Sequence, residues 1–336
     1  MKPLFYLLAI YYTLSISGCV PSESASTERL LLKSGFEDGV SISEDLENIN
    51  GADYPGYSWD DTLSWIKSSR FAYIVGDDKQ LNEFMESAIE SQLGPSGDSS
   101  KVLRLTNIKD DPDHSATSRN EFSFFGKDAP YDYQEGYVRY WMKLQDNLDQ
   151  LIPYQESSPF YMIMEWKEPN SKVRWSADEC DSCCQSRPGG TNNYRININL
   201  QKDANSSNLY WLIRGEQPQP CRIEEWRYDN REVPVPVGEW FLVEAYMKKH
   251  TTEGRVYFAI NEQVVLDTDQ VQPEGFSDRT THIQNPMRLQ FWSPMKNYHG
   301  MRWNHAGPVS QWYDDIEIWN GFPTGHPALT HKKNKL

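Results

Sequence analysis

The sequence predicts an all-β fold, a sandwich of two antiparallel sheets with one short helix. Roughly ten or more short segments alternate apolar and polar residues with a period of two, which is typical of strands with one buried face. In residues 194–201, for example, Ile196 and Ile198 alternate with Asn197 and Asn199. Helical periodicity is confined to one segment. Many strands without alternating helices favour a sandwich or jelly roll over a parallel α/β fold.

The predicted strands follow one another along most of the chain. Two of them, residues 254–260 and 263–267, flank an Asn261-Glu262 turn and form a hairpin series with residues 240–248. Residues 40–70 are rich in loops. The other predicted strands are residues 30–36, 101–108, 118–125, 136–144, 159–167, 194–201, 209–214, 287–292 and 311–319.

The one predicted helix of any size covers the 80s. Apolar residues there recur at helical spacing: Leu81, Phe84, Met85, Ala88 and Ile89. Asp77 or Asp78 can cap its start, and Gly94-Pro95 would end it.

The N-terminus reads as a targeting segment. Lys2 precedes an apolar stretch that is too short to span a bilayer comfortably, and the stretch ends in Ile16-Ser17-Gly18-Cys19. This resembles a bacterial lipoprotein signal (residues 1–18), and an ordinary secretory peptide is the alternative. The resemblance implies that Cys19 carries fatty acids such as palmitate, so that the membrane is contacted only through this anchor. The implied location is the bacterial outer membrane or cell surface, with the periplasmic side as the alternative.

The remaining chain is expected to form one domain. Residues 19–29 are a Ser-rich linker, residues 30–325 show no break in composition, and residues 326–336 are a basic tail. The four other cysteines, an even number in an oxidising compartment, predict two disulfides, and zinc binding by the Cys-x-x-Cys-Cys cluster is the alternative. They would pin loops at 176–190 and 215–231. They are Cys180, Cys183, Cys184 and Cys221.

Composition limits the partners. The formal net charge is −15, which disfavours nucleic acid and anionic lipid as ligands. A local basic site on such a protein can still bind a polyanionic sugar. Aromatic residues make up 13% of the chain, with 12 Trp and 19 Tyr. Aromatic rings stack on sugars and also fill the cores of sandwiches, so both uses are expected.

The segment from Ser118 to Phe124 is the most informative strand. Its alternation would place Arg119 and Glu121 on one face and Phe122 and Phe124 on the other. An Arg and a Glu held side by side form a rigid polar patch that suits an acidic sugar. A salt bridge within the sheet is the alternative.

Three segments then resemble one family. They are Gly238-Glu239-Trp240, the run from Gly254 to Val265, and the end Trp312-Tyr313-Asp314-Asp315-Ile316-Glu317-Ile318-Trp319. Together they resemble the concanavalin-like jelly-roll proteins, and among them polysaccharide lyases of the alginate lyase, glucuronan lyase and heparin lyase I type. Arg119-Asn120-Glu121-Phe122 is similar to the Arg-Ser/Thr-Glu-Leu strand of those alginate lyases. The resemblance implies a β-jelly roll that cleaves an acidic polysaccharide of the alginate, glucuronan, ulvan or glycosaminoglycan type.

The sequence departs from that family at two motifs. Where the alginate lyases carry Gln-Ile/Val-His, this chain has Met164-Glu165-Trp166-Lys167. Their Tyr-Phe-Lys-x-Gly-x-Tyr strand is echoed only by Met295-Lys296-Asn297-Tyr298. The catalytic set of the family therefore cannot be transferred as a unit.

A lyase of this kind needs three functions. A cation or hydrogen-bond donor stabilises the charge that develops beside the uronate carboxylate, a base removes the C5 proton, and an acid protonates the departing O4. A tyrosine can do both proton transfers when a neighbouring cation lowers its pKa. No cofactor is required. The predicted catalytic residues are Arg119, Tyr298, His299 and His305, with the last three expected in or beside a loop over the sheet.

Strand residues of the polar faces are predicted to bind the substrate, since arginine clamps carboxylates and amides donate hydrogen bonds. Ordinary sheet surface is the alternative for Arg195. They are Glu121, Arg139, Glu165, Lys167, Arg195, Asn197, Asn199, Arg288, Gln290 and Trp292. Arg302, in the segment expected to form a loop over the sheet, is predicted to bind the substrate as well.

A structural Ca²⁺ is a further expectation. Glu37 and Asp38 follow the first strand, and Asp314 and Asp315 lie in the last one, so these oxygens would meet if the two strands were neighbours. A solvated acidic edge is the alternative.

Two other functions fit the same residues. A glycoside hydrolase on this fold would need two carboxylates at a defined separation, and the Glu-x-Asp-x-x-Glu signature of the jelly-roll glucanases is absent. A surface lipoprotein that binds glycans without cleaving them would use the same arginines and aromatic residues.

Overall fold

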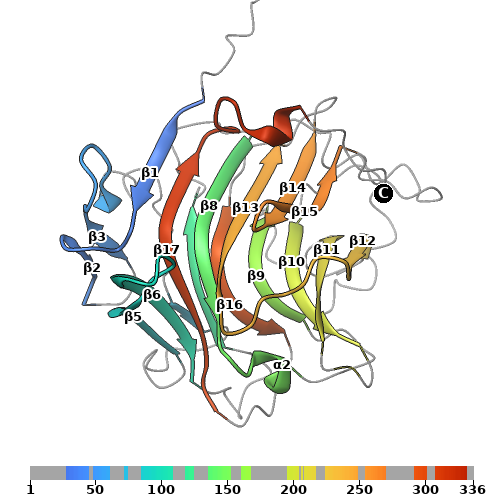
Figure 1. The fold of residues 1–336 in the computed structure, drawn as a ribbon, viewed down its shortest axis with the longest axis horizontal. Coiled ribbons are helices and arrows are strands. Elements are labelled where there is room, and N and C mark those ends of the chain that lie inside the picture. The colour runs from blue at the N-terminus through green and yellow to red at the C-terminus, as the bar shows by residue number, and fades with distance from the viewer. Residues whose placement is uncertain are drawn as a thin grey trace, which may run out of the picture.

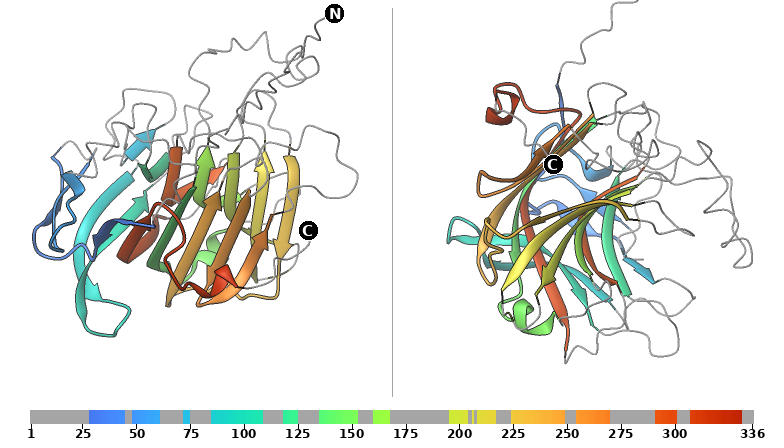
Figure 2. Two further views of the ribbon diagram at one scale, coloured as in Figure 1. Left: turned by 90° about the horizontal axis from the view of Figure 1, so that it is seen from above. Right: turned by 90° about the vertical axis from the view of Figure 1, so that its right-hand side faces the viewer.

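Two antiparallel sheets packed face to face form the fold in the computed structural model (Figures 1 and 2). The structure describes residues 28–44, 48–60, 72–74, 85–108, 118–124, 135–152, 160–167, 195–203, 206, 208–216, 224–248, 254–269, 291–300 and 307–330. This confirms the predicted all-β sandwich. The described helices are the short α2 (Leu148–Leu151) and the 3-10 turn η4 (Pro327–Leu329), and neither has the length and apolar character needed to cross a membrane.

One sheet has eight strands among the described residues, and we call it the eight-stranded sheet. Its order is β15-β14-β13-β8-β17-β6-β5, and β1 pairs with β17 as well. The strands are β1 (Leu30–Ser34), β5 (Met85–Leu93), β6 (Ser99–Asn107), β8 (Glu135–Leu144), β13 (Trp240–Lys248), β14 (Arg255–Ile260), β15 (Gln263–Thr268) and β17 (Val309–Trp319).

The other sheet, the seven-stranded sheet, has the order β12-β11-β10-β9-β16-β7-β4. A separate pair of short strands, β2 (Val40–Ile42) and β3 (Ile49–Gly51), lies within the region predicted as loop. The strands of the seven-stranded sheet are β4 (Ala72–Ile74), β7 (Ser118–Phe124), β9 (Phe160–Lys167), β10 (Arg195–Lys202), β11 (Leu209–Glu216), β12 (Glu224–Asn230) and β16 (Phe291–Gly300).

The hydrophobic core lies between the two sheets. Alternate residues of each strand enter it, for example Tyr140 and Met142 from β8 and Ile196 and Ile198 from β10. Burying such side chains stabilises the fold by about 1.5–3 kcal/mol each. The residues that alternate with these core residues along each strand therefore lie on the outer faces of the two sheets.

A buried polar network crosses this core and ties β16 to the opposite sheet. The amide Nδ2 of Asn297 donates to the carbonyl oxygens of Leu105 (3.0 Å) and Val309 (2.8 Å). Its Oδ1 accepts from Asn107 Nδ2 (3.0 Å) and from the Tyr161 hydroxyl (3.1 Å). Satisfied buried polar groups have few alternative arrangements. The network thereby fixes the position of β16, including the residues on either side of Asn297.

The segment after β17 covers part of the outer face of the eight-stranded sheet. Phe322 stacks on Tyr246 with ring centroids 4.1 Å apart, and Arg255 donates to the Ala328 carbonyl (2.6 Å). His326 Nε2 lies 2.9 Å from Glu244 Oε1. Burial raises the pKa of Glu244, but hydrogen bonds from His326 and Tyr137 outweigh it and leave that pKa lowered. Residues 326–330, which the sequence assigned to a basic tail, therefore belong to the packed domain.

Two local predictions were wrong. Met85 to Leu93, predicted as a helix, forms strand β5 and pairs with β6 along its whole length. The apolar spacing suited a helix, but nine ladder pairs with a neighbouring strand outweigh that weak preference. Residues 215–231 were predicted as a loop, yet β11 extends to Glu216 and Glu224–Asn230 forms the edge strand β12.

Candidate functional site

The three strands that carry the sequence motifs lie side by side as β7-β16-β9 in the seven-stranded sheet. The register places Arg119 opposite Tyr298 and Glu121 opposite Lys296. On its other side, Tyr298 stands opposite Met162 of β9. Segments separated by more than a hundred residues in the sequence are thus brought together at one place.

Lys296 and Tyr298 lie on the outer face of this sheet. Their neighbours Met295 and Asn297 point into the core, where Met295 packs and Asn297 forms the cross-sheet network. Since side chains alternate along a strand, Lys296 and Tyr298 face the other way. The sequence predicted Tyr298 and His299 in or beside a loop, and this was wrong, because both lie within β16.

Lys296 forms a buried ion pair on this face. Its Nζ lies 2.5 Å from Glu165 Oε2, and both side chains are almost completely buried. The same Nζ lies 5.5 Å from the centre of the Tyr298 ring, which is only partly buried. The Lys296 ammonium therefore lies close to a tyrosine, with its charge balanced by Glu165.

The polar face continues across β10 and β11. Asn197 stands opposite Glu165 on one side and Arg214 on the other, and all three side chains are buried. In the next row, Asn199 donates to the Leu212 carbonyl at 3.4 Å. Its Oδ1 is buried and has no hydrogen-bond partner among the residues that the structure describes. A buried acceptor without a donor costs free energy.

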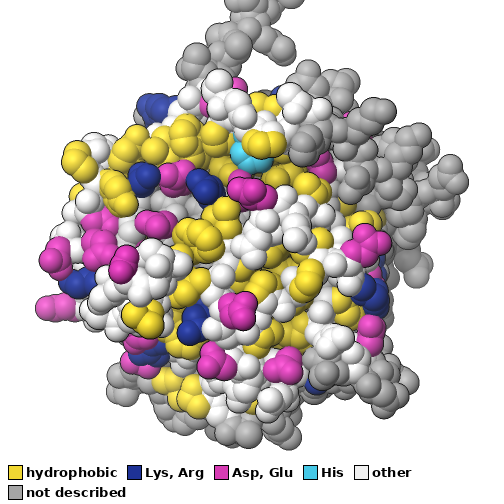
Figure 3. All heavy atoms as spheres, viewed as in Figure 1, with side chains coloured by type: hydrophobic (Ala, Val, Ile, Leu, Met, Phe, Trp, Pro, Cys, Tyr) yellow, Lys and Arg dark blue, Asp and Glu magenta, His cyan; other side chains and the backbone are white. Residues whose placement is uncertain are grey.

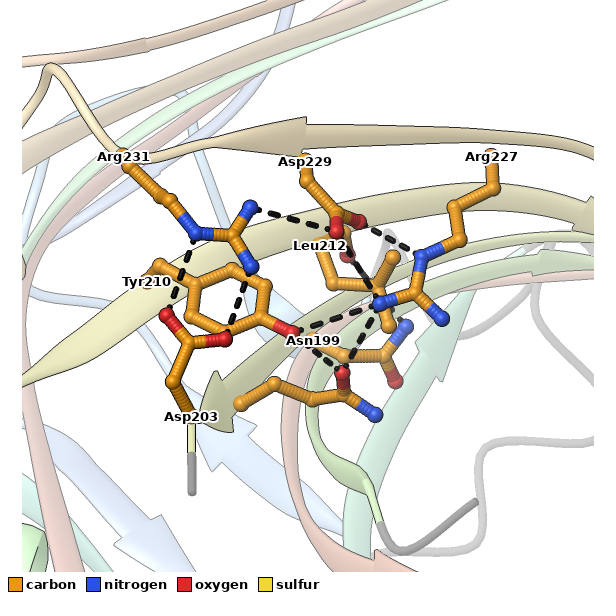
Figure 4. A network of polar contacts seen from close by, with 8 residues as sticks. Asn199, Asp203, Tyr210, Leu212, Arg227, Asp229 and Arg231 are labelled. Atoms are coloured by element: carbon orange, nitrogen blue, oxygen red, sulfur yellow. Dashed lines mark hydrogen bonds and ion pairs between the residues drawn. The ribbon is translucent and has the colours of Figure 1, made fainter. Parts of the chain in front are cut away.

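The face ends at β12 in a network of two arginines (Figure 4). Arg227 binds Asp229 (2.6 and 3.0 Å) and reaches Gln201 (3.1 Å). Arg231 forms a bidentate pair with Asp203 (3.1 and 2.8 Å), and its guanidinium lies 3.9 Å from the centre of the Tyr210 ring. Both arginines remain partly exposed at 38% and 48% of their side-chain surface. Their charges are balanced by the two aspartates.

Sequence reasoning did not select Lys296, Arg214, or the residues of the arginine network. The signal for the network was present, because Arg227, Asp229 and Arg231 alternate with Tyr228 and Asn230 as they do on a strand. It was missed because this region was assigned to a loop pinned by disulfides. Lys296 was noted only as part of a weak motif.

Two predicted binding residues lie elsewhere. Arg139 is on β8 of the eight-stranded sheet, opposite Glu244 and Glu317, so it cannot join this face. Trp292 is fully buried in the core, stacked on Trp166 at 6.0 Å. A register irregularity between Trp292 and Met295 explains the difference, because the extra residue turns both of these side chains inward.

The structure places a few of the remaining predicted residues by strand register alone, and does not describe the others. The register puts Arg195 opposite Lys167, beside the row of Asn197 and Glu165. It puts His299 opposite the core residue Tyr161, on the other side of β16 from Tyr298. Several predicted residues lie outside the described residues, and the disulfide, lipid-anchor and linker predictions fall there too. These are Cys19, Cys180, Cys183, Cys184, Cys221, Arg288, Gln290, Arg302 and His305.

The acidic residues proposed for calcium do lie near one another, since β1 pairs with β17. The Ser100 hydroxyl lies 2.8 Å from Glu37 and 3.0 Å from Asp314, and Asp38 pairs with Lys101. Burial and the neighbouring Asp315 raise the pKa of Asp314 to about 7. Within the described ranges, no group of three or more His, Cys, Asp or Glu side chains is arranged to hold a metal ion. Calcium therefore stays a prediction, which melting curves with and without the ion would test.

Comparison with known proteins finds matches among solved structures at low sequence identity. No family model and no curated protein sequence matches the chain. Among solved structures, a GH131 β-glucanase catalytic domain from Podospora anserina has 10% identity and a TM-score of 0.39, covering 86% of this chain and 95% of that one. An endo-1,3-β-glucanase from Streptomyces sioyaensis has 8% identity and a TM-score of 0.36, covering 88% and 96%. The lectin UEA-II has 9% identity and a TM-score of 0.34, covering 75% and 98%.

Proposed function

We propose that this protein is a polysaccharide lyase that cleaves a uronic-acid polymer by β-elimination. The observation that carries the proposal is the register of three neighbouring strands, which sets Arg119 opposite Tyr298 and Glu121 opposite Lys296, with Lys296 bound to Glu165. This combination supplies a cation, a phenol and hydrogen-bond donors on one sheet face. Those are the parts that β-elimination needs.

The reaction assigns a role to each part. A base takes the C5 proton, the C5–H electron pair forms the C4=C5 bond, and the C4–O4 bond breaks, with O4 taking a proton from an acid. We assign the proton transfers to Tyr298, with His305 as the second proton carrier. The register puts His299 at a core-side position opposite Tyr161, so it does not share this face. Arg119 would neutralise the uronate carboxylate, which lowers the barrier to removing the adjacent proton.

The amides of β10 suit the same substrate. Asn197 and Asn199 lie on the outer face of the sheet, in rows that lead from Glu165 and Met162. We propose that a sugar hydroxyl donates a hydrogen bond to Asn199 Oδ1, which has no donor among the described residues. We propose that Asn197, Asn199 and Arg195 extend the binding site for the polymer beyond the residue that is cleaved.

The hydrolase alternative finds less support on this face. It requires two carboxyl groups that are available as acid and as base or nucleophile. Among the carboxylates of this face whose side chains the structure describes, Glu165 is engaged by Lys296, Asp203 by Arg231, and Asp229 by Arg227 and Arg231. A binding protein without activity would use the same residues and is separated only by the absence of product.

Screening alginate, glucuronan, ulvan and heparin-type polymers tests the proposal. A lyase product absorbs in the ultraviolet because its new C=C bond is conjugated to the carboxylate. We expect such absorbance with at least one polymer. New reducing ends without ultraviolet absorbance would identify a hydrolase, and polymer binding without either signal would identify a glycan-binding protein.

We also propose that the chain is a surface lipoprotein anchored through Cys19, as the Ile-Ser-Gly-Cys signal suggests. Cys19→Ala should then move the protein from the membrane fraction to the soluble fraction of expressing bacteria. Retention of the variant in the membrane fraction would contradict the anchor.

A further inference from the structure

We propose that the outer face of the eight-stranded sheet carries a second binding site for an anionic polysaccharide, formed by Trp240, Lys143 and Trp312. These three residues, which we call the Trp-Lys-Trp row, stand directly opposite one another on β13, β8 and β17. The site lies on the other sheet from Tyr298 and Lys296. It is therefore separate from the proposed catalytic face.

The row faces away from the core. The adjacent residues Phe241, Met142 and Tyr313 are fully buried between the sheets, so alternation directs the row outward. All three row side chains are partly exposed, and neither tryptophan belongs to an apolar cluster among the described residues. Figure 3 looks onto this side of the molecule and shows hydrophobic side chains spread over it, with charged ones between them.

Each indole is held by its nitrogen edge. Trp240 Nε1 donates to the Leu93 carbonyl (2.8 Å), and Trp312 Nε1 donates to Glu90 (2.8 Å). Both acceptors come from β5, so the β5–β6 hairpin reaches over this face and borders the row. Leu93 is 67% exposed there. Fixed rings lose little entropy when a ligand stacks on them, which favours binding.

The spacing and chemistry of the row suit a sugar chain. Two strand intervals separate Trp240 from Trp312, a distance of about 10 Å, comparable to two linked pyranose rings. Tryptophan rings present broad apolar faces with a polar edge, as sugar stacking requires. A single apolar ligand would not need the charge that stands between them.

Lys143 indicates that the polymer is anionic. Its ammonium lies 5.8 Å from the Trp312 ring centre and has no carboxylate partner within the described part of the chain. The other cation nearby, Arg104, is bound by Glu86 (2.9 Å) and Glu90 (2.8 Å). Lys143 can thus pair with a uronate carboxylate while the sugar rings stack on Trp240 and Trp312.

Polymer binding by Lys143→Gln tests the site, with Arg139→Gln as the matched control. Arg139 lies on the same strand and the same outer face as Lys143. Its substitution removes one positive charge, as Lys143→Gln does, but leaves the Trp-Lys-Trp row intact. Both changes are made in Tyr298→Phe protein so that the polymer is not degraded, and binding of glucuronan and alginate is measured by affinity electrophoresis at low and high salt.

We expect Lys143→Gln to weaken polymer binding several-fold and to reduce its salt dependence, while Arg139→Gln leaves both unchanged. The double variant Trp240→Ala/Trp312→Ala should weaken binding by about tenfold, or about 1.4 kcal/mol. When the same substitutions are made in the protein that keeps Tyr298, its turnover of short oligosaccharides should match that of the parent. Unchanged polymer binding in the folded Lys143 and double-tryptophan variants would overturn the site. If only the double tryptophan variant lost polymer binding, the claim that the ligand is anionic would be overturned. Because binding is scored without turnover, these outcomes do not depend on whether the protein is a lyase.

Discussion

The ammonium group of Lys296 and the carboxylate of Glu165 form an ion pair of 2.5 Å in which both side chains are buried. It joins β16 to β9 on the proposed catalytic face. Removing one partner from a buried pair leaves an uncompensated charge in a poorly solvated environment. The pair therefore makes this face sensitive to substitution at either end.

Glu165→Gln should lower the free energy of unfolding by about 3–5 kcal/mol, because Lys296 would remain charged in the interior after losing its Glu165 carboxylate. The double variant Glu165→Leu/Lys296→Met should be clearly more stable than either single variant, since it removes both charges. Denaturant unfolding followed by tryptophan fluorescence measures these values. Equal losses in the single and double variants would show that the ion pair itself contributes nothing specific.

Tyr298→Phe should abolish turnover while polymer binding is retained, because only the hydroxyl that transfers the proton is lost. Tyr246→Phe is the matched control, since its hydroxyl bonds to Glu135 on the opposite sheet (2.5 Å). The control should keep full activity. Initial rates of ultraviolet absorbance give the comparison, and full turnover by Tyr298→Phe would remove the acid/base assignment.

Arg119→Ala should lose turnover and substrate binding at the proposed catalytic face, because Arg119 is assigned to the substrate carboxylate there. Arg139→Ala, which removes an exposed arginine from the other sheet, should bind and cleave as the parent does. Binding of oligosaccharides by calorimetry separates the two effects. Equal binding by the two variants would place the carboxylate contact elsewhere.

The fold was predictable from the sequence because period-two alternation marks most strands independently of their partners. The prediction failed where tertiary pairing decides the outcome. Met85 and Ile89 fit a helical spacing as well as a strand, and only the ladder with β6 selects the strand. Trp292 lies on the core face and not on the predicted outer face, because the register shift in β16 cannot be recognised from the local alternation of residues.

The candidate site was predictable only in part. Arg119, Tyr298 and the β10 amides follow from alternation and from the resemblance to lyases, and the register brings their strands together. The Lys296–Glu165 pair was not predictable, because it depends on which strands become neighbours. The same holds for Arg139, whose strand looks like the others in sequence but belongs to the other sheet.

Asn297→Ala should reduce both stability and turnover although Asn297 does not touch the substrate face. It would leave the buried Leu105 and Val309 carbonyls without their donor, at a cost of about 1–3 kcal/mol each. The position of Lys296 and Tyr298 would loosen as a result. We expect a lower kcat with a smaller change in KM, measured below the melting temperature of the variant. An unchanged kcat would show that the cross-sheet network does not position the site.

Stability should fall between about pH 4 and pH 7 on account of Asp314. Burial, followed by the charge of Asp315, raises its pKa from 3.8 to about 7 in the folded protein. The folded state therefore holds a proton that the unfolded state has lost in this range, and its advantage decreases as the pH rises. In Asp314→Asn this part of the pH dependence should disappear, so that the stability of the variant rises relative to that of the parent above pH 7. Melting temperatures recorded from pH 4 to pH 8 give the test, and parallel curves for the two proteins would contradict it.

The most direct measurement is the number of C=C bonds formed for each new reducing end when the protein degrades a uronic-acid polymer. Ultraviolet absorbance counts the former and a reducing-sugar assay counts the latter in the same sample. The proposed β-elimination predicts one C=C bond per cleavage. Reducing ends that accumulate without the double bond would contradict it.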